Sequence, residues 1–216
     1  MNDNASDILS SPFNNDRLRG VRVKADADIA DSLQGVNQFN VTFSHGIDGL
    51  GSTGNDNPLA SRAAGRVAFS KIEGTISRTQ PLPARFSAYG SLTGQYAGTS
   101  LLSSEQCGYG GRFFGRAFDP SAILGDHCWQ ALGELRYDLP ATAQIQQMQF
   151  YGFSDYGKVL TREPAAGTDA SAHGASAGAG LRLTLLEDLS TDLQAAKAVA
   201  GPRNDWRFFF SATAKY

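Results

Sequence analysis

The stretch Phe86-Ser-Ala-Tyr-Gly-Ser-Leu-Thr-Gly-Gln-Tyr96 decides the fold class of this chain. One alternating set of its residues is Phe86, Ala88, Gly90, Leu92, Gly94 and Tyr96, and the other is Ser87, Tyr89, Ser91, Thr93 and Gln95. The side chains of a β-strand point alternately to its two faces. This alternation therefore predicts a strand with one face more apolar than the other.

The same period of two recurs along most of the chain. It marks ten segments, at residues 16–26, 35–46, 65–79, 84–97, 103–110, 127–138, 145–156, 174–186, 189–199 and 205–216. Strands of soluble proteins average about 5–6 residues, whereas membrane-crossing strands need about 9–11. The segment lengths predict an all-β fold over residues 16–216, an antiparallel transmembrane β-barrel or partial barrel that forms a meander of about ten strands. Residues 188–200 also permit a helix, but the alternation favours a strand.

The composition agrees with a membrane barrel and excludes several other classes. Only 41% of the 216 residues are hydrophobic, and no run approaches the length of apolar chain that a membrane-spanning helix needs. A barrel shows lipid only every second side chain, so its average composition is polar. The net charge of −2 predicts no nucleic-acid partner.

No cofactor, metal site or catalytic activity is expected. The chain has two Cys and three His, without the spacing of a zinc site. Asp119, Asp126, His127 and Glu134 are the acid and base candidates, but no nucleophile or metal motif accompanies them.

The first fifteen residues are polar and are expected to be irregular or disordered. They lack the basic start and apolar core of a signal peptide. An exported protein needs such a signal, so either it lies on an upstream segment or the chain is not exported. Connections 81–84 and 186–188 are short, whereas 48–65, 111–126 and 157–173 are long. Barrels of the outer membrane have short periplasmic turns and long outer loops. If the chain has ten strands and ends in the periplasm, however, alternation of strand direction would place the long segment 48–65 on the periplasmic side.

The segment from Leu101 to Asp126 carries motifs of a known family. In order they are Gly110-Gly111, Arg116-Ala117-Phe118 and Gly125-Asp126, followed by Glu134-Leu-Arg-Tyr137, Phe153-Ser-Asp155-Tyr-Gly157 and a final Asp205-Trp-Arg-Phe-Phe-Phe210. Together they resemble the haemolysin secretion/activation proteins, the outer-membrane transporters of two-partner secretion. The family has Gly where this chain has Ala117, and Ala would be costly there if the position needs a positive φ.

The resemblance implies a translocator in the outer membrane of a Gram-negative bacterium. Its partners would be outer-membrane lipid and a secreted haemolysin- or adhesin-like exoprotein. It implies that the long loop folds into the barrel lumen and that Arg116 meets Asp155 there. The lumen motif would comprise Gly110, Gly111, Arg116, Ala117, Phe118, Phe153, Asp155 and Gly157. The family has sixteen strands, a plug helix and two periplasmic POTRA domains, so this chain resembles its carboxy-terminal part.

Cys107 and Cys128 flank this loop, and two readings of them stay open. Strands joined by a loop are usually neighbours, so the cysteines can face each other and form a disulfide in the oxidising envelope. They can equally be two unrelated buried thiols.

Two other functions also remain open. A passive porin-like channel would conduct constitutively and would need no Arg116–Asp155 pair. A soluble β-barrel binding module would be extracted without detergent.

Overall fold

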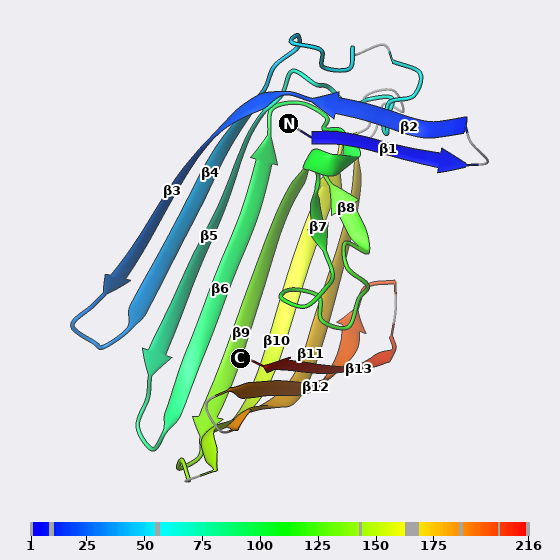
Figure 1. Cartoon of the computed structure of the whole chain (residues 1–216). Coiled ribbons are helices and arrows are strands. Elements are labelled where there is room, and N and C mark those ends of the chain that lie inside the picture. Colours follow the sequence, from blue (N-terminus) through cyan, green and yellow to red (C-terminus); the bar gives the residue numbers. More distant parts are fainter. Residues whose placement is uncertain are drawn as a thin grey trace.

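The protein is an antiparallel β-structure built around one sheet of nine strands (Figure 1). The computed structural model describes residues 2–8, 11–54, 57–142, 144–162, 169–185, 188–202 and 204–214, with the backbone alone for 2–8 and 11–13. The strands of the sheet are β3 (Gly20–Ala30), β4 (Val36–Gly46), β5 (Ser70–Pro81), β6 (Phe86–Ala97), β9 (His127–Asp138), β10 (Ile145–Thr161), β11 (Ala170–Leu185), β12 (Leu189–Ala200) and β13 (Trp206–Ala214). Their order in space follows the chain, and all neighbours are antiparallel.

The predicted all-β meander is confirmed, with one strand fewer in the main sheet. The segment 103–110 was wrongly predicted as a strand of that sheet. It contains the 3₁₀ turn η1 (Ser103–Glu105) and the short β7 (Cys107–Tyr109), which pairs with β8 (Ile123–Gly125). After β7, Gly110 and Gly111 have φ values of +117° and +122°, which end the extended chain.

Residues 1–15 were expected to be irregular, but β1 (Asn2–Ile8) and β2 (Ser11–Leu18) pair there as an antiparallel hairpin. Backbone pairing leaves a period of two in the sequence only where one face is buried, and this polar stretch has no such pattern. Residues 189–200 form a strand rather than a helix. No helix in the described residues is long and apolar enough to cross a membrane.

Because segment 103–110 is not a strand of the main sheet, the short and the long connections fall at opposite ends of the sheet. The connections 31–35, 82–85, 139–144 and 186–188 are short and share one end of the sheet with the end of β13. The two long segments 47–69 and 98–126 leave from the opposite end, the upper end in Figure 1. This is the arrangement of an outer-membrane barrel whose carboxy-terminus is periplasmic.

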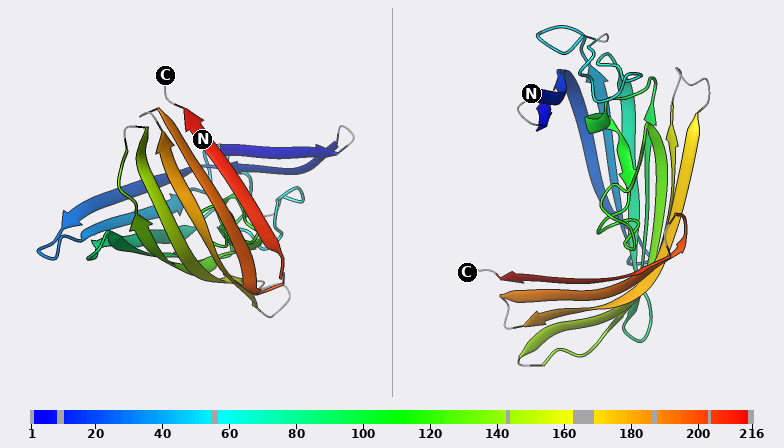
Figure 2. Two further views of the ribbon diagram at one scale, coloured as in Figure 1. Left: turned by 90° about the horizontal axis from the view of Figure 1, so that it is seen from below. Right: turned by 90° about the vertical axis from the view of Figure 1, so that its right-hand side faces the viewer.

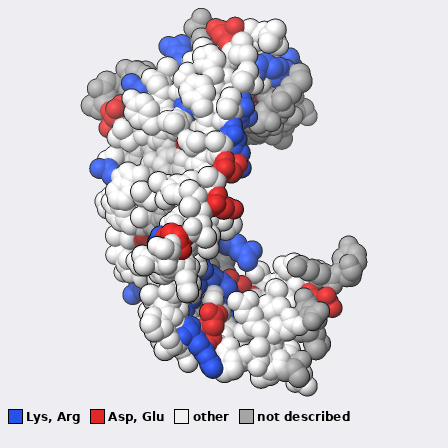
Figure 3. All heavy atoms as spheres, turned by 90° about the vertical axis from the view of Figure 1, so that its left-hand side faces the viewer, with Lys and Arg blue, Asp and Glu red and all other residues white. Residues whose placement is uncertain are grey.

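The two faces of the sheet differ as the alternation predicted. One outward row, set by the strand register, is Phe86, Tyr137, Phe150, Leu181, Leu193 and Phe210. Large apolar side chains on this face are exposed, among them Leu92 at 50% and Phe208 at 78%. Charged side chains gather along the inside of the curve, and the outer face is mostly uncharged (Figure 3). Such an apolar exterior fits lipid, because soluble proteins rarely expose contiguous apolar patches of this kind.

The sheet is curved and open. Figure 2 shows a trough, with β7 and β8 on its inner side. Within the described part of the chain, β3 and β13 each pair on one side only. An open edge leaves unpaired N–H and C=O groups, which are costly in lipid. One of the two open edges is that of β3, which begins at Gly20.

A lipid-facing and a lumen-facing arginine should have different effects. Leu92 faces outward near the middle of β6, so Leu92→Arg should oppose insertion by about 2–4 kcal/mol. Thr93→Arg is the matched control, because Thr93 lies on the inner face beside Thr75. Refolding into lipid vesicles, followed by heat-modifiable gel mobility, measures the inserted fraction. Equal insertion of the two variants would contradict the assignment of the faces.

Candidate functional site

The candidate site is the long segment 98–126 between β6 and β9, which folds against the concave face of the sheet (Figures 1 and 2). Its side chains form the centre of the larger buried cluster, in which Tyr109 and Phe118 are almost fully enclosed. The loop therefore occupies the space that would be the lumen of a closed barrel.

The loop arginine pairs with a different carboxylate from the one expected. Arg116 Nη2 donates to Glu134 Oε1 of β9 over 2.6 Å, and the same carboxylate accepts from Arg136 and Arg182. The predicted Arg116–Asp155 pair is wrong for this structure. Cross-strand register places Glu134 beside Phe153, whereas Asp155 lies beside Leu132, two residues further along the strand.

Aromatic rings complete the environment of the arginines. The Arg116 guanidinium lies 4.1 Å from the ring centroid of Phe153, and that of Arg182 lies 3.9 Å from Tyr151. The negative face of an aromatic ring attracts a cation, the more so where water is excluded. Phe153, predicted as part of the lumen motif, thus contacts Arg116 directly.

Asp155 holds the loop through other groups. Its Oδ1 accepts hydrogen bonds from the Tyr109 hydroxyl at 2.7 Å and from the Gly115 N–H at 2.8 Å, and its Oδ2 accepts from Ser176 at 2.7 Å. Burial, together with the Asp155 carboxylate, raises the pKa of Tyr109 well above its usual range, so its hydroxyl remains a donor. Asp155 is therefore a second anchor of the loop, and one of the groups it binds, the Gly115 N–H, is next to Arg116 in the chain.

Glycine is required where the loop meets the sheet. A Cβ on Gly157 would lie 2.2 Å from the Tyr109 ring, and one on Gly174 would lie 2.6 Å from it. These two glycines of β10 and β11 make the hollow that receives Tyr109. In contrast, Ala117 is not among the residues with positive φ, so alanine causes no backbone strain at this position.

Two further carboxylates fix the base of the loop, and sequence reasoning missed both roles. Asp126, fully buried, accepts from Arg62 at 2.7 Å and from the backbone N–H groups of Leu101 and Arg162. Glu105 pairs with Arg22 of β3 and, at 3.1 Å, with Lys71 of β5. The signal in the sequence was the presence of Lys71 and Arg22 on inward-facing positions, where an unpaired charge is unfavourable.

The structure joins Cys107 of β7 to Cys128 of β9 by a disulfide, with a Cα–Cα distance of 6.3 Å. The bond encloses the segment that contains Gly110, Gly111 and Arg116. It ties the base of the loop covalently to the sheet, while the tip is held by non-covalent bonds alone.

The far side of the loop reaches the last strand. Asp119 pairs with Arg207 of β13 at 2.5 Å, and Arg112 donates to Ser211 at 2.6 Å. The loop consequently contacts strands from β3 to β13 across the whole trough.

Comparison with known proteins agrees with this geometry. A family model described as haemolysin secretion/activation protein ShlB/FhaC/HecB matches residues 22–183, about three quarters of the chain. The chain belongs to this family. The resemblance inferred from the loop and strand motifs is thereby confirmed.

Two relatives of this family are informative. The outer membrane transporter CdiB of Dickeya dadantii (strain 3937) is 27% identical over 144 residues, which cover 67% of this chain and 25% of that protein. The solved structure of CdiB from Escherichia coli superposes with a TM-score of 0.79 at 19% identity, over 95% of this chain and 38% of that one. The latter likeness concerns the fold alone. This chain thus spans about a quarter of the curated relative's length.

Loss of Glu134 should be worse than loss of Arg116. Glu134→Gln leaves Arg116, Arg136 and Arg182 without a common anion, which should lower the unfolding free energy by about 3–5 kcal/mol. Arg116→Ala removes one charge-assisted bond, worth about 1.5–3 kcal/mol, and leaves Glu134 paired. Urea unfolding in detergent measures both. Glu73→Gln is the control, since Glu73 is 43% exposed and its pair with Lys71 is worth at most about 1 kcal/mol. A reversed order would contradict this account of the cluster.

The disulfide should stabilise the folded loop. Its cysteines are 21 residues apart, and closure of a loop of that size is worth about 3 kcal/mol in the chain-entropy model. The double variant Cys107→Ser with Cys128→Ser should show that loss in unfolding experiments. Thiol labelling of non-reduced, envelope-derived protein tests the bond itself. Full labelling of both cysteines before reduction would show that it is absent.

Proposed function

We propose that this chain forms the carboxy-terminal part of the wall of an outer-membrane pore, and that the pore secretes an exoprotein by two-partner secretion. Residues 16–216 supply the wall and segment 98–126 supplies its gate. The observation that carries the proposal is the loop itself. It fills the concave, polar side of a membrane-type sheet and is held there at its tip by ionic and hydrogen bonds.

The chemistry of the two faces supports a path for an unfolded chain. The outer face is apolar and suits lipid, whereas the inner face presents polar groups such as Gln149, Ser91 and Thr93. A polar interior can hydrate an extended polypeptide. No nucleotide is available in this compartment, so we propose that folding of the cargo outside the cell drives its passage.

The cargo class is inferred from the family. We propose a haemolysin- or adhesin-like exoprotein, because the family is described as haemolysin secretion/activation proteins and one relative is named as an outer membrane transporter. The same relationship supports a location in the outer membrane, with lipid against the apolar rows.

Strand direction indicates that the wall needs additional strands. In an all-antiparallel sheet of nine, β3 and β13 run in the same direction. Direct contact between them would be a parallel pair, whereas transmembrane barrels are antiparallel. An odd number of further strands must lie between the two edges, so we assign transport to the completed barrel and not to these nine strands alone.

The gate is tested by secretion through the complete transporter. Arg116→Ala should lower secretion several-fold while the protein still inserts, because loss of about 1.5–3 kcal/mol of bonding shifts the loop population about tenfold or more. Arg116→Lys should recover part of the loss, since it keeps the charge beside Glu134 but not the planar group over Phe153.

Arg112→Ala is the matched control, because Arg112 belongs to the same loop but donates to Ser211 at the exposed surface rather than to a buried carboxylate. It should secrete like the parent. A passive porin would instead conduct ions without any cargo, and its conductance would be the same in the parent and in Arg116→Ala, Arg116→Lys and Arg112→Ala. That result, with no effect of Arg116→Ala on export, would refute the proposal.

A further inference from the structure

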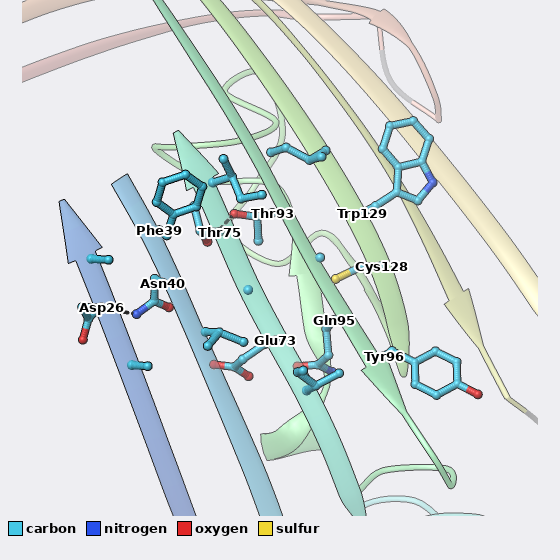
Figure 4. A pocket seen from close by; sticks show the side chains of 18 residues that line it. Asp26, Phe39, Asn40, Glu73, Thr75, Thr93, Gln95, Tyr96, Cys128 and Trp129 are labelled. Carbon is cyan, nitrogen blue, oxygen red and sulfur yellow. Dashed lines mark hydrogen bonds between the residues drawn. The ribbon is translucent and has the colours of Figure 1, made fainter. Parts of the chain in front are cut away.

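The outer face of the sheet contains an apolar groove that the gate does not use. It has a volume of about 650 Å³ and crosses β3, β4, β5, β6 and β9 (Figure 4). This is the size range of small-molecule binding sites. Phe39, Tyr96 and Trp129 stand around it in the close view.

Small residues create the hollow. Strand register aligns Ala25, Val41, Gly74, Gly94 and Trp129 in one outward row. Three of these residues have no side chain beyond Cβ. The row therefore projects less from the sheet than the two rows beside it, and a groove is left between them. One neighbouring row contains Phe39, Ile76 and Leu92, and the other contains Phe43, Ile72 and Tyr96.

The groove begins near the loop end of the sheet. Trp129 lies two residues from the start of β9, and its ring centroid is 5.1 Å from that of Tyr156. The ring centroid of Tyr96 lies 4.8 Å from that of His127, with the two rings tilted relative to each other. Aromatic side chains of this kind sit at the interface between lipid and water. From there the groove runs toward Leu92, in the middle of β6.

A cation stands beside the aromatic end. Lys158 of β10 is the register partner of Trp129, faces outward and is exposed. A lysine near the membrane surface attracts anionic head groups by about 1 kcal/mol. The groove therefore has an apolar body and a positive charge at its interfacial end.

Backbone pairing excludes a peptide strand as the ligand. The groove lies over the interior of the sheet, where each of β4, β5, β6 and β9 already pairs on both sides. No free row of N–H and C=O groups remains there to pair with an added strand. A ligand must therefore bind by apolar contact, which suits a hydrocarbon chain.

We propose that this groove binds an acyl chain of a phosphate-bearing lipid of the outer leaflet, with the phosphate at Lys158. The site goes beyond the secretion function and shares with it only the position in the outer membrane. The long loops mark the outer side, so the polar end of the groove meets the outer leaflet. The acyl chain would fill the groove over Gly74 and Gly94, so that this part of the outer face packs against the bilayer without a gap.

Lipid binding to the detergent-solubilised chain tests the site, by native mass spectrometry with diphosphorylated lipid A as the probe. Gly94→Leu fills the groove and should weaken binding about tenfold or more. Gly133→Leu is the matched control and should bind like the parent. Gly133 is also an outward glycine, and nothing lies within 4 Å of the Cβ it would gain.

The charge is tested by Lys158→Gln, which should weaken binding about fivefold. Lys197→Gln is its control, because Lys197 lies beside Trp206 on the outer face of β12, away from the groove. Diacylglycerol, which has acyl chains but no phosphate, should bind the parent more weakly than lipid A does.

Heat-modifiable mobility verifies folding of each variant, and Gly94→Ala replaces Gly94→Leu if the latter does not fold. Equal binding by the parent and the filled variant would overturn the groove. Equal binding by Lys158→Gln and the parent, or of both lipids, would overturn the phosphate contact. Secretion is measured separately, so failure here is distinct from failure of the proposed gate.

Discussion

The interior of this protein depends on one buried carboxylate. Glu134 is 4% exposed and accepts hydrogen bonds from Arg116 of the loop, Arg136 of its own strand and Arg182 of β11. Removing charges from water is costly unless they are paired and bonded. A single anion pairs with cations from three segments, the loop, β9 and β11, and it fixes where the loop lies against the concave face.

The sequence predicted the strands well because one face of each is apolar. The resulting alternation can be recognised along a single strand, whatever its register with its neighbours. It could not predict which inward carboxylate meets Arg116. Glu134 and Asp155 both point inward from adjacent strands, and only the register separates them, by two residues along the sheet. The family motif pointed to Asp155, which does anchor the loop, but through Tyr109 and Gly115.

The base of the loop was less predictable for another reason. Segment 103–110 has the alternation of a strand, yet β7 stops at Tyr109 because two glycines with positive φ follow it. Alternation describes which face a side chain occupies and says nothing of which sheet the strand joins. The same limit hid Glu105, whose partners on β3 and β5 are far away in sequence.

The distribution of bonds between loop and sheet also explains how a buried loop can be released. If the tip leaves, Glu134 keeps Arg136 and Arg182, and Asp155 keeps Ser176. Each of these two sheet carboxylates thus keeps a partner. Withdrawal of the loop tip therefore leaves neither of them buried and unpaired. Arg116 itself moves into a polar lumen, where water replaces its partner. The disulfide at Cys107 holds the base meanwhile, so the tip returns to the same partners. In the proposed gate, this partial pairing on the wall would let the loop tip leave and return without leaving a sheet carboxylate unpaired.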